Sequence, residues 1–153
     1  MCSCELTGLD NIVHERNQLG NQTFKLNGYL HRTDGPAWIG AAGDQAWWQK
    51  GERHRTDGPA IVGADGHEQW WLYGQRHRSD GPAIIGKHAG EQWWLNGVRH
   101  RIDGPALTDA NGRQTWWIQG KEITNQVNLW MHNKQVTWPW DVATQAEFVL
   151  TWC

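Results

Sequence analysis

The sequence predicts a mostly β protein: an elongated antiparallel β-hairpin meander that forms a repeat array in a single twisted sheet, with a small C-terminal α/β cap. The main observation is a block of 23 residues that repeats four times without insertion or deletion. A motif, called here the His-Arg box (His-Arg-x-Asp-Gly-Pro-Ala), begins at His31, His54, His77 and His100. A Trp pair keeps the same spacing at Trp47-Trp48, Trp70-Trp71, Trp93-Trp94 and Trp116-Trp117. Strict spacing of this kind is typical of arrays in which each unit buries its apolar face against its neighbours.

The repeat boundaries divide the chain into three segments. Residues 1–23 are polar and do not repeat, which predicts an N-terminal arm or cap. Residues 24–123 hold four repeats and a partial fifth, which decays after Gly120, where Ile123 replaces the His of the box. Residues 124–153 differ in character and are predicted to be a C-terminal cap, because an array needs distinct terminal units to protect its ends. The full repeats cover residues 24–46, 47–69, 70–92 and 93–115.

Each repeat is predicted to contribute one hairpin. In the repeat over residues 93–115, Asn96-Gly97 is the strongest short signal for a two-residue turn. The matching turns are Asn27-Gly28, Lys50-Gly51, Tyr73-Gly74 and Gln119-Gly120. The return strand bends at Asp103-Gly104-Pro105, because proline cannot donate to a ladder. A second turn around Asn111-Gly112 then leads to the next Trp pair.

The C-terminal cap is predicted to contain a helix and a closing strand. Asn125 is a candidate N-cap for a helix over 126–135, with Val127, Trp130 and Met131 facing inward. The segment Trp138-Pro139-Trp140 ends it. Alternation of Phe148, Leu150 and Trp152 favours a strand, and a helix that starts from Asp141 is the alternative.

The register of the two-residue turns separates the side chains onto two faces. Leu95 should pair with Val98, Trp94 with Arg99 and Trp93 with His100. The face with the first Trp of each pair, the Leu or Ile two residues later and the His is the better candidate for the core. The other face carries a partly exposed row, called here the Trp/Arg ladder, which is the predicted binding site. Its members are Trp48, Arg53, Trp71, Arg76, Trp94, Arg99 and Trp117.

Composition argues against several function classes. The balance of 14 basic and 16 acidic residues gives no global field for nucleic acid or membrane, and no long apolar stretch is present. Cys2, Cys4 and Cys153 lie at the chain ends and outside the repeats, which indicates a reducing cytoplasm rather than a disulfide scaffold. The box is interpreted as structural, with each Asp closing a turn and each Arg pairing with a nearby Asp. We therefore expect no enzyme, metal or cofactor, although the box Arg could bind anions if the Asp did not neutralise it.

The Trp pair, the x-Gly turn, the basic return strand and the Gly-marked second turn, at a period of 23 residues, resemble MORN repeats. The His-Arg box resembles more closely the MORN-like repeats of many bacterial, phage and giant-virus proteins, over about residues 24–123. Typical MORN units use Tyr and Gly where this chain has Trp-Trp and Asp-Gly-Pro. The resemblance implies a hairpin meander used for protein–protein interaction or scaffolding, including a phage-type effector that inhibits a host or defence protein.

Three functions remain open from the sequence. The leading hypothesis is a non-enzymatic binding or scaffold protein whose ladder contacts a protein partner, because aromatic residues and Arg dominate binding hot spots. The second is capture of a nucleotide or single-stranded nucleic acid, in which Trp stacks bases and Arg holds phosphates. The third is self-assembly into a homo-oligomer through the aromatic ladder and open sheet edges. No membrane partner is expected.

Overall fold

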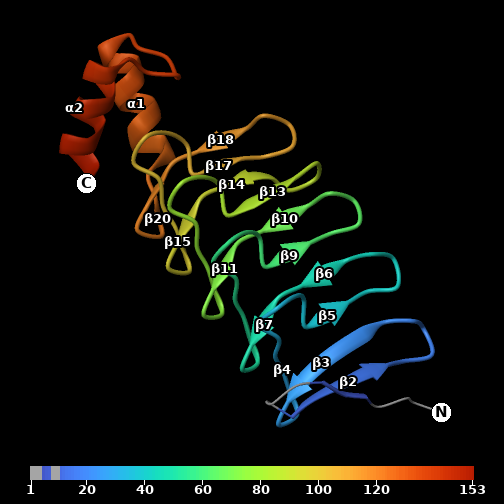
Figure 1. Cartoon of the computed structure of the whole chain (residues 1–153). Coiled ribbons are helices and arrows are strands. Elements are labelled where there is room, and N and C mark those ends of the chain that lie inside the picture. The colour runs from blue at the N-terminus through green and yellow to red at the C-terminus, as the bar shows by residue number, and fades with distance from the viewer. Residues whose placement is uncertain (1–4, 8–10) are drawn as a thin grey trace. The chain divides into compact units, whose positions relative to one another are not determined.

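The computed structural model describes residues 5–7 and 11–153, and the chain divides into two compact units, Met1–His77 and Arg78–Cys153. The architecture is mostly β, with antiparallel hairpins that follow one another along the chain and two helices at the C-terminus (Figure 1). This confirms the predicted fold class, a hairpin meander built from repeats.

In the first unit, the sheet runs in the order β1-β2-β3-β5-β6-β9-β10, and all neighbours are antiparallel. Its strands are β1 (Glu5–Thr7), β2 (Ile12–Arg16), β3 (Gln22–Leu26), β5 (Trp38–Ile39), β6 (Gln45–Ala46), β9 (Ile61–Val62) and β10 (Glu68–Gln69). The remaining strands of this unit are β4 (Tyr29–Leu30), which pairs with β3, and the two-stranded ribbons β7 (Trp48–Gln49) with β8 (Glu52–Arg53) and β11 (Trp71–Leu72) with β12 (Gln75–Arg76).

The second unit has the same pattern of sheet hairpins and separate ribbons. Its sheet strands are β13 (Ile84–Gly86), β14 (Gly90–Gln92), β17 (Leu107–Thr108) and β18 (Gln114–Thr115), in that order. Its ribbons are β15 (Trp94–Leu95) with β16 (Val98–Arg99) and β19 (Trp117–Ile118) with β20 (Lys121–Glu122).

The predicted hairpin register is confirmed in every ribbon. Leu95 pairs with Val98, and Trp94 with Arg99. The turn residues Asn96 and Gly97 have φ of 49° and 80°, the left-handed conformations that a two-residue hairpin turn requires. The equivalent pairs are Trp48 with Arg53, Trp71 with Arg76 and Trp117 with Glu122.

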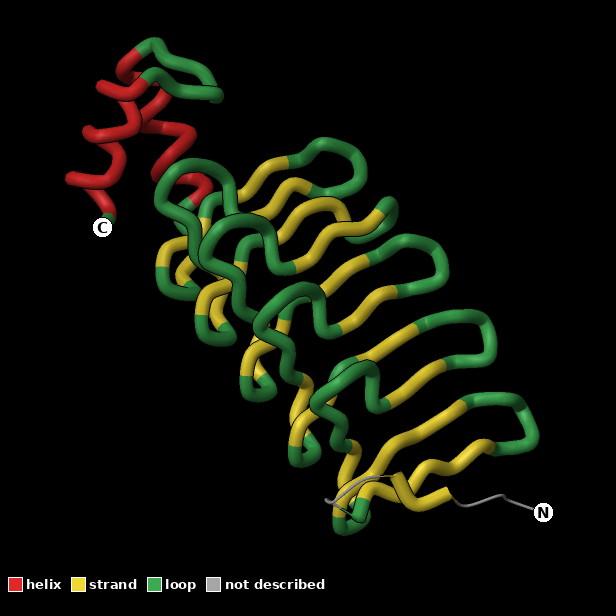
Figure 2. The backbone as a smooth tube through the Cα atoms, in the orientation of Figure 1, coloured by secondary structure: helices red, strands yellow, loops and turns green. Residues whose placement is uncertain are grey.

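The prediction of one hairpin per repeat is wrong in detail, because each bent strand is divided in two. The first Trp of a pair lies between the two pieces: the Trp47 N–H donates to the carbonyl of Ala60 at 2.8 Å, and the Trp93 N–H to that of Ala106 at 2.7 Å. On the return strand, the His-Arg box with its Gly-Pro lies between the two pieces and divides that strand as well. Each full repeat after the first therefore forms one hairpin in the sheet and one separate ribbon (Figure 2), whereas in the first repeat β4 pairs with β3 of the sheet.

The core of the repeats is made mainly by the alanine of the box, which the sequence did not single out. Ala37, Ala60, Ala83 and Ala106 are all fully buried, at 0% exposure. The face with the first Trp was the expected core, yet Trp47, Trp70 and Trp93 are only half-buried, and only Trp116 is buried. Only a small side chain fits where the chain changes direction between sheet and ribbon, so alanine occupies that point in every repeat.

The histidine of the box ties one repeat to the next. His54 is 6% exposed, and its Nδ1 accepts the backbone N–H of Tyr73 in the following turn at 3.2 Å. His31 accepts the N–H of Lys50 at 3.0 Å in the same way, and His100 that of Gln119 at 3.1 Å. The acceptor nitrogen must be unprotonated, so this bond fixes the tautomer with the proton on Nε2.

Replacement of His54 by Leu is expected to lower the free energy of unfolding by about 1–3 kcal/mol, because a backbone N–H in the turn loses its acceptor and a buried ring is replaced. Urea unfolding followed by circular dichroism measures this. The exposed His88 provides the matched control, and His88→Leu should change stability by less than about 0.5 kcal/mol. Equal effects of the two substitutions would show that the box histidine does not join the repeats.

The C-terminal segment contains two helices, α1 (Thr124–Lys134) and α2 (Val142–Trp152). The first was predicted, but its N-cap is Ile123 rather than Asn125, which lies in the first turn. The closing strand is wrong, and the alternative is confirmed: Asp141 caps α2 by accepting the N–H of Thr144 at 2.7 Å. Both regular elements of the C-terminal cap are therefore helices. Phe148 and Trp152 are about one helical turn apart, so α2 places both side chains on one face, toward the same core.

The helices pack on the last repeat through an aromatic core. The buried members are Trp116, Ile118, Ile123, Val127 and Phe148, with Trp130, Met131, Trp138, Trp140 and Trp152 packed around them. The inward direction predicted for Val127, Trp130 and Met131 is thereby confirmed. A helical cap gives the last ribbon, β19–β20, an apolar surface to pack on in place of a further repeat.

Candidate functional site

The Trp/Arg ladder forms an alternating stack in the first unit. The guanidinium of Arg53 lies 4.8 Å from the ring of Trp48 and 5.0 Å from the ring of Trp71. Arg76 lies 4.7 Å from Trp71 on its other side. Each hairpin places its own Trp opposite its own Arg, and the next ribbon brings a second Trp over the same guanidinium. The four predicted residues of this unit are therefore brought together.

The second unit repeats the arrangement. Arg99 lies 5.0 Å from the Trp94 ring and 5.1 Å from the Trp117 ring, so its guanidinium is again held between two indoles. Trp117 pairs with Glu122 where the other repeats have Arg, and the ladder of described residues ends there. A guanidinium stacked on two rings has lost most of its rotamer freedom, so a partner would not have to order it on binding.

Hydrogen bonds from the sheet fix the indoles of the ladder. For three of the four second Trp residues, the residue two positions earlier points to the same face and accepts the Nε1–H: Gln69 from Trp71 at 3.2 Å, Gln92 from Trp94 at 3.3 Å and Thr115 from Trp117 at 2.8 Å. Gln92 Oε1 also accepts Nη2 of Arg99 at 3.1 Å. All seven ladder residues are half-buried, so part of each residue stays accessible to solvent.

The arginine of the box serves a structural role. In the second repeat, Nε of Arg55 donates to Asp57 at 2.8 Å, Nη1 donates to the carbonyl of Pro59 at 3.1 Å, and the guanidinium covers the ring of Trp47 at 4.0 Å. The same Arg–Asp pair occurs in every box: Arg32–Asp34, Arg55–Asp57, Arg78–Asp80 and Arg101–Asp103. Anion binding by the box Arg was expected only if the Asp did not neutralise it. Each of these Arg has its Asp partner, so that condition is not met.

These pairs predict a loss of stability in acid. Hydrogen bonds from Arg55 and Arg78, and next the attraction of their charges, lower the pKa of Asp57 and of Asp80. In the unfolded chain these Asp have a pKa of about 3.9, so on acidification the unfolded chain binds protons before the folded chain does. The pairs therefore stabilise the fold above about pH 4, and this contribution is lost as the pH falls through the folded-state pKa. Urea unfolding at pH 6 and pH 3 should show a smaller acid loss for Asp57→Asn/Asp80→Asn than for the wild type, and an equal loss would contradict these pairs.

The geometry of the box does not form a catalytic dyad. The box His bonds a turn N–H, and the box Asp bonds its Arg, so the two side chains face different partners. Asp65 and His67, which do contact each other at 2.6 Å, lie in a turn between repeats. Among the described residues, no three His, Cys, Asp or Glu lie close enough to hold a metal ion. Cys2 and Cys4 fall outside those residues, and Cys153 is an exposed free thiol.

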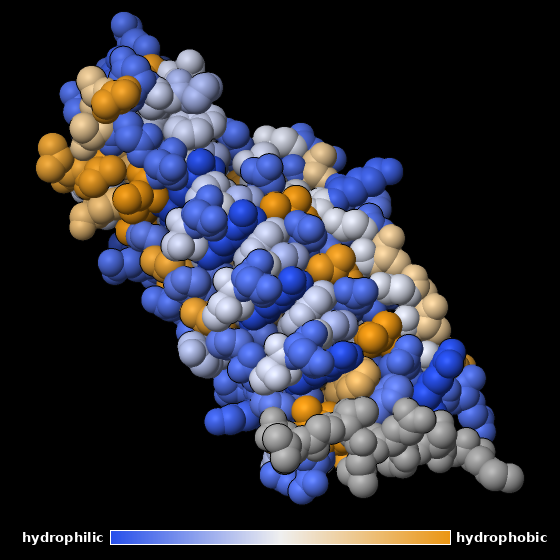
Figure 3. Space-filling model, viewed as in Figure 1, coloured by the Kyte–Doolittle hydropathy of each residue, from blue (hydrophilic) through white to orange (hydrophobic). Residues whose placement is uncertain are grey.

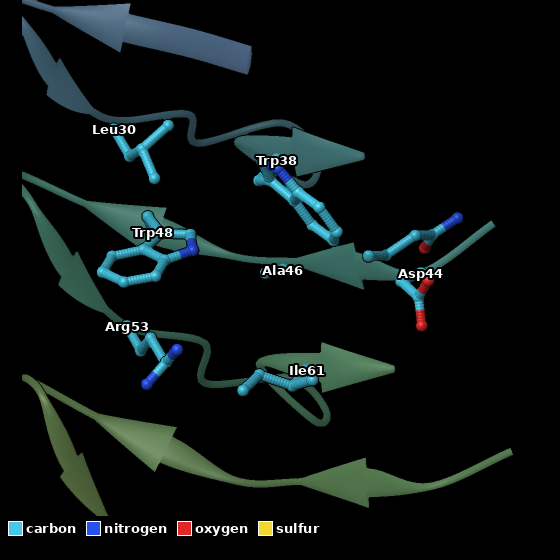
Figure 4. Close-up of a pocket in the computed structure, with 8 residues that line it drawn as sticks. Leu30, Trp38, Asp44, Ala46, Trp48, Arg53 and Ile61 are labelled. Carbon is cyan, nitrogen blue, oxygen red and sulfur yellow. The ribbon is translucent and has the colours of Figure 1, made fainter. Parts of the chain in front are cut away.

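One feature beside the ladder was not predicted. A pocket of about 340 Å³ opens in the first unit, and Trp38, Ala46, Trp48 and Arg53 are among the side chains that line it (Figure 4). The repeat period carries a signal for it. Ala46 falls at the position of Gln69, Gln92 and Thr115, and Trp38 at that of Ile61, Ile84 and Leu107.

In the part of the chain that the structure describes, neither helix is long and apolar enough to cross a membrane. No protein-family model and no curated protein matches this sequence. The resemblance to MORN-like repeats, which rests on the box and the Trp pair, therefore stays a prediction.

Proposed function

We propose that this chain is a non-enzymatic binding or scaffold protein, and that the Trp/Arg ladder is its contact surface for a protein partner in the cytoplasm. The observation that supports it is the interleaved stack itself: Arg53 between Trp48 and Trp71, and Arg99 between Trp94 and Trp117. Trp and Arg are enriched in binding hot spots, and here they are already held in fixed positions at a half-exposed surface. A MORN-like phage-type effector that inhibits a host or defence protein is one form that such a binding protein would take.

The packing of the ladder favours a protein over a nucleic acid. Two guanidinium groups lie over the Trp71 ring, that of Arg53 at 5.0 Å and that of Arg76 at 4.7 Å, so a base that stacks there would compete with them. The parts of these half-buried residues that remain accessible suit a protein interface, which uses edge contacts and hydrogen bonds. A nucleotide or single strand would show binding that weakens steeply with salt, whereas a protein contact through this surface should depend on salt weakly.

Self-assembly is supported by a second surface. Val142 and Leu150 on α2 are 88% and 87% exposed, and Leu129 on α1 is also exposed. Figure 3 shows apolar surface gathered over the C-terminal helices of the second unit. Such a patch is a common site of association between protein molecules. Mass measured by light scattering over a hundredfold range of concentration separates a homo-oligomer from a monomer that awaits another partner.

The test of the proposed function is affinity capture from the native host lysate, followed by mass spectrometry. The bait proteins are the wild type, Trp71→Ala, Trp94→Ala and the control Glu91→Ala, whose side chain is exposed and lies on the face opposite Gln92. Circular dichroism must show that each variant is folded.

We expect a protein captured in stoichiometric amount by the wild type and by Glu91→Ala, and weakened at least about 30-fold by each Trp variant, the effect of a hot-spot residue. Capture that is equal for all four baits would contradict the ladder as the contact surface. An empty capture by the folded wild type would contradict a protein partner, and light scattering and salt-dependent nucleotide binding would then decide between the two alternatives.

A further inference from the structure

In the ribbon β15–β16, one side-chain oxygen serves two donors of the ladder. Gln92 Oε1 accepts both Nε1 of Trp94 at 3.3 Å and Nη2 of Arg99 at 3.1 Å. The oxygen therefore satisfies the indole and balances part of the guanidinium charge. Polar groups buried without such a partner cost about 1–3 kcal/mol each, which explains why a polar residue stands at this position in three repeats.

The first repeat lacks this oxygen. Ala46 stands where the other repeats have Gln69, Gln92 and Thr115, and it is buried. As a result, Nε1 of Trp48 is buried and has no hydrogen-bond partner among the described residues, whereas the indoles of Trp71, Trp94 and Trp117 each have one. Nε of Arg53 is also buried without a partner among these residues, as is Nε of Arg99, so the missing oxygen accounts for the indole and not for this Nε. Nor does Arg53 form an ion pair with any residue that the structure describes.

The missing side chain leaves a pocket rather than a collapsed core. The pocket of about 340 Å³ is lined by Leu30, Trp38, Asp44, Gln45, Ala46, Trp48, Arg53 and Ile61. Its floor is Ala46, with Trp38 and Ile61 as cross-strand neighbours on either side. Figure 4 shows Trp48 between Leu30 and Arg53, with its Nε1 turned toward Ala46. The volume is in the range of sites for small organic ligands.

The other end of the pocket has a different character. Asp44 lies beyond Trp38, away from Trp48 and Arg53 (Figure 4). The Trp38 ring folds over Gly40, where an added Cβ would lie 2.7 Å from Cη2, so the glycine makes room for this ring. The pocket thus has two hydrogen-bond donors and a cation at one end, apolar walls in the middle and a carboxylate at the other end.

We propose that this pocket binds a small carboxylate with a flat, apolar body. One carboxylate oxygen lies where Gln92 Oε1 lies in the later repeat and accepts from Trp48 and Arg53. The apolar body lies over Ala46 between Trp38 and Ile61, and a cationic group at its far end faces Asp44. A carboxylate fits better than a neutral amide, because charge-assisted hydrogen bonds are roughly twice as strong as neutral ones. The pocket shares Trp48 and Arg53 with the ladder, but the inference does not rest on the proposed function, because it is argued from the pocket and from the unpartnered indole above Ala46.

Four related probes test this chemistry: benzoate, 4-(aminomethyl)benzoate, benzamide and terephthalate. The readout is the indole N–H signal of Trp48 in ¹H–¹⁵N spectra, identified as the signal that disappears in Trp48→Phe. We expect a saturable shift with benzoate, with Kd in about the millimolar range for so small a ligand. 4-(Aminomethyl)benzoate should bind more tightly, and benzamide and terephthalate about tenfold more weakly than benzoate, because one lacks the charge and the other meets Asp44.

The decisive variant is Ala46→Gln, which supplies the missing oxygen and fills the pocket with the residue of the later repeats. It should keep or raise the urea midpoint and weaken benzoate binding more than tenfold, whereas Gln75→Ala, an exposed control, should leave binding unchanged. Shifts that never saturate, equal affinity for benzoate and benzamide, or binding that persists in a stable Ala46→Gln protein would each overturn the proposal.

Discussion

Phe148→Ala is expected to lower the free energy of unfolding by about 3–5 kcal/mol, the cost of removing a large buried aromatic side chain. Phe148 has 0% exposure, and its ring lies 4.9 Å from Trp140, 4.9 Å from Trp152 and 6.2 Å from Trp130. Alanine would leave a cavity among these three indoles, which cannot close without moving both helices. Urea unfolding followed by the helical circular dichroism signal measures the loss.

The control is Leu150→Ala two residues later. Leu150 is 87% exposed in α2, so its removal should change stability by less than about 0.5 kcal/mol. The comparison also tests the secondary structure, because in a strand Phe148 and Leu150 would share one face and both would be costly to remove. Equal losses would therefore argue against the helix α2.

Trp71→Ala is expected to cost about 2–3 kcal/mol, somewhat less than a fully buried tryptophan because the ring is half-exposed. It removes two guanidinium stacks, with Arg53 at 5.0 Å and Arg76 at 4.7 Å, each worth about 0.5–1 kcal/mol at an exposed site. It also leaves the Gln69 oxygen without its indole donor. The loss is measured from urea unfolding followed by circular dichroism, and the chain should remain folded.

Trp71→Phe separates the ring from its hydrogen bond. It keeps an aromatic face for both guanidinium groups and loses the indole Nε1, so a cost of about 1 kcal/mol is expected. The exposed Gln75 on the same ribbon gives the baseline through Gln75→Ala, which should be nearly neutral. If Trp71→Ala cost no more than Gln75→Ala, the ladder would add nothing to the fold and the stacking geometry would be wrong.

Local signals gave the repeat fold and the ladder. The x-Gly pairs fix the turn type, and the turn fixes which residue faces which, so the pairing of Trp48 with Arg53 and of Trp94 with Arg99 could be read from spacing alone. The period of 23 residues then places equivalent side chains in neighbouring repeats. What spacing did not predict is that the guanidinium groups of Arg53 and Arg99 also reach the Trp of the following repeat, because that distance depends on the angle between adjacent ribbons.

The errors occur where packing overrides a local pattern. Phe148, Leu150 and Trp152 alternate as in a strand, but two of the three also fit one helical face, and the Asp141 cap with the aromatic core selects the helix. The division of the strand was not predicted, because no residue near Trp47 in the sequence indicates that the Trp47 N–H donates to the carbonyl of Ala60. The pocket at Ala46 was visible only as a departure from the polar residue of the other repeats.

The most direct test of the ladder as a contact surface is hydroxyl-radical footprinting of the tryptophans, with and without the captured partner. The account predicts that Trp71 and Trp94 become protected in the complex, while Trp47 and Trp93, which the box arginines cover on another side of the repeat, keep their reactivity. Protection confined to Trp47 and Trp93, or to the tryptophans of the C-terminal helices, with Trp71 and Trp94 unchanged, would contradict it.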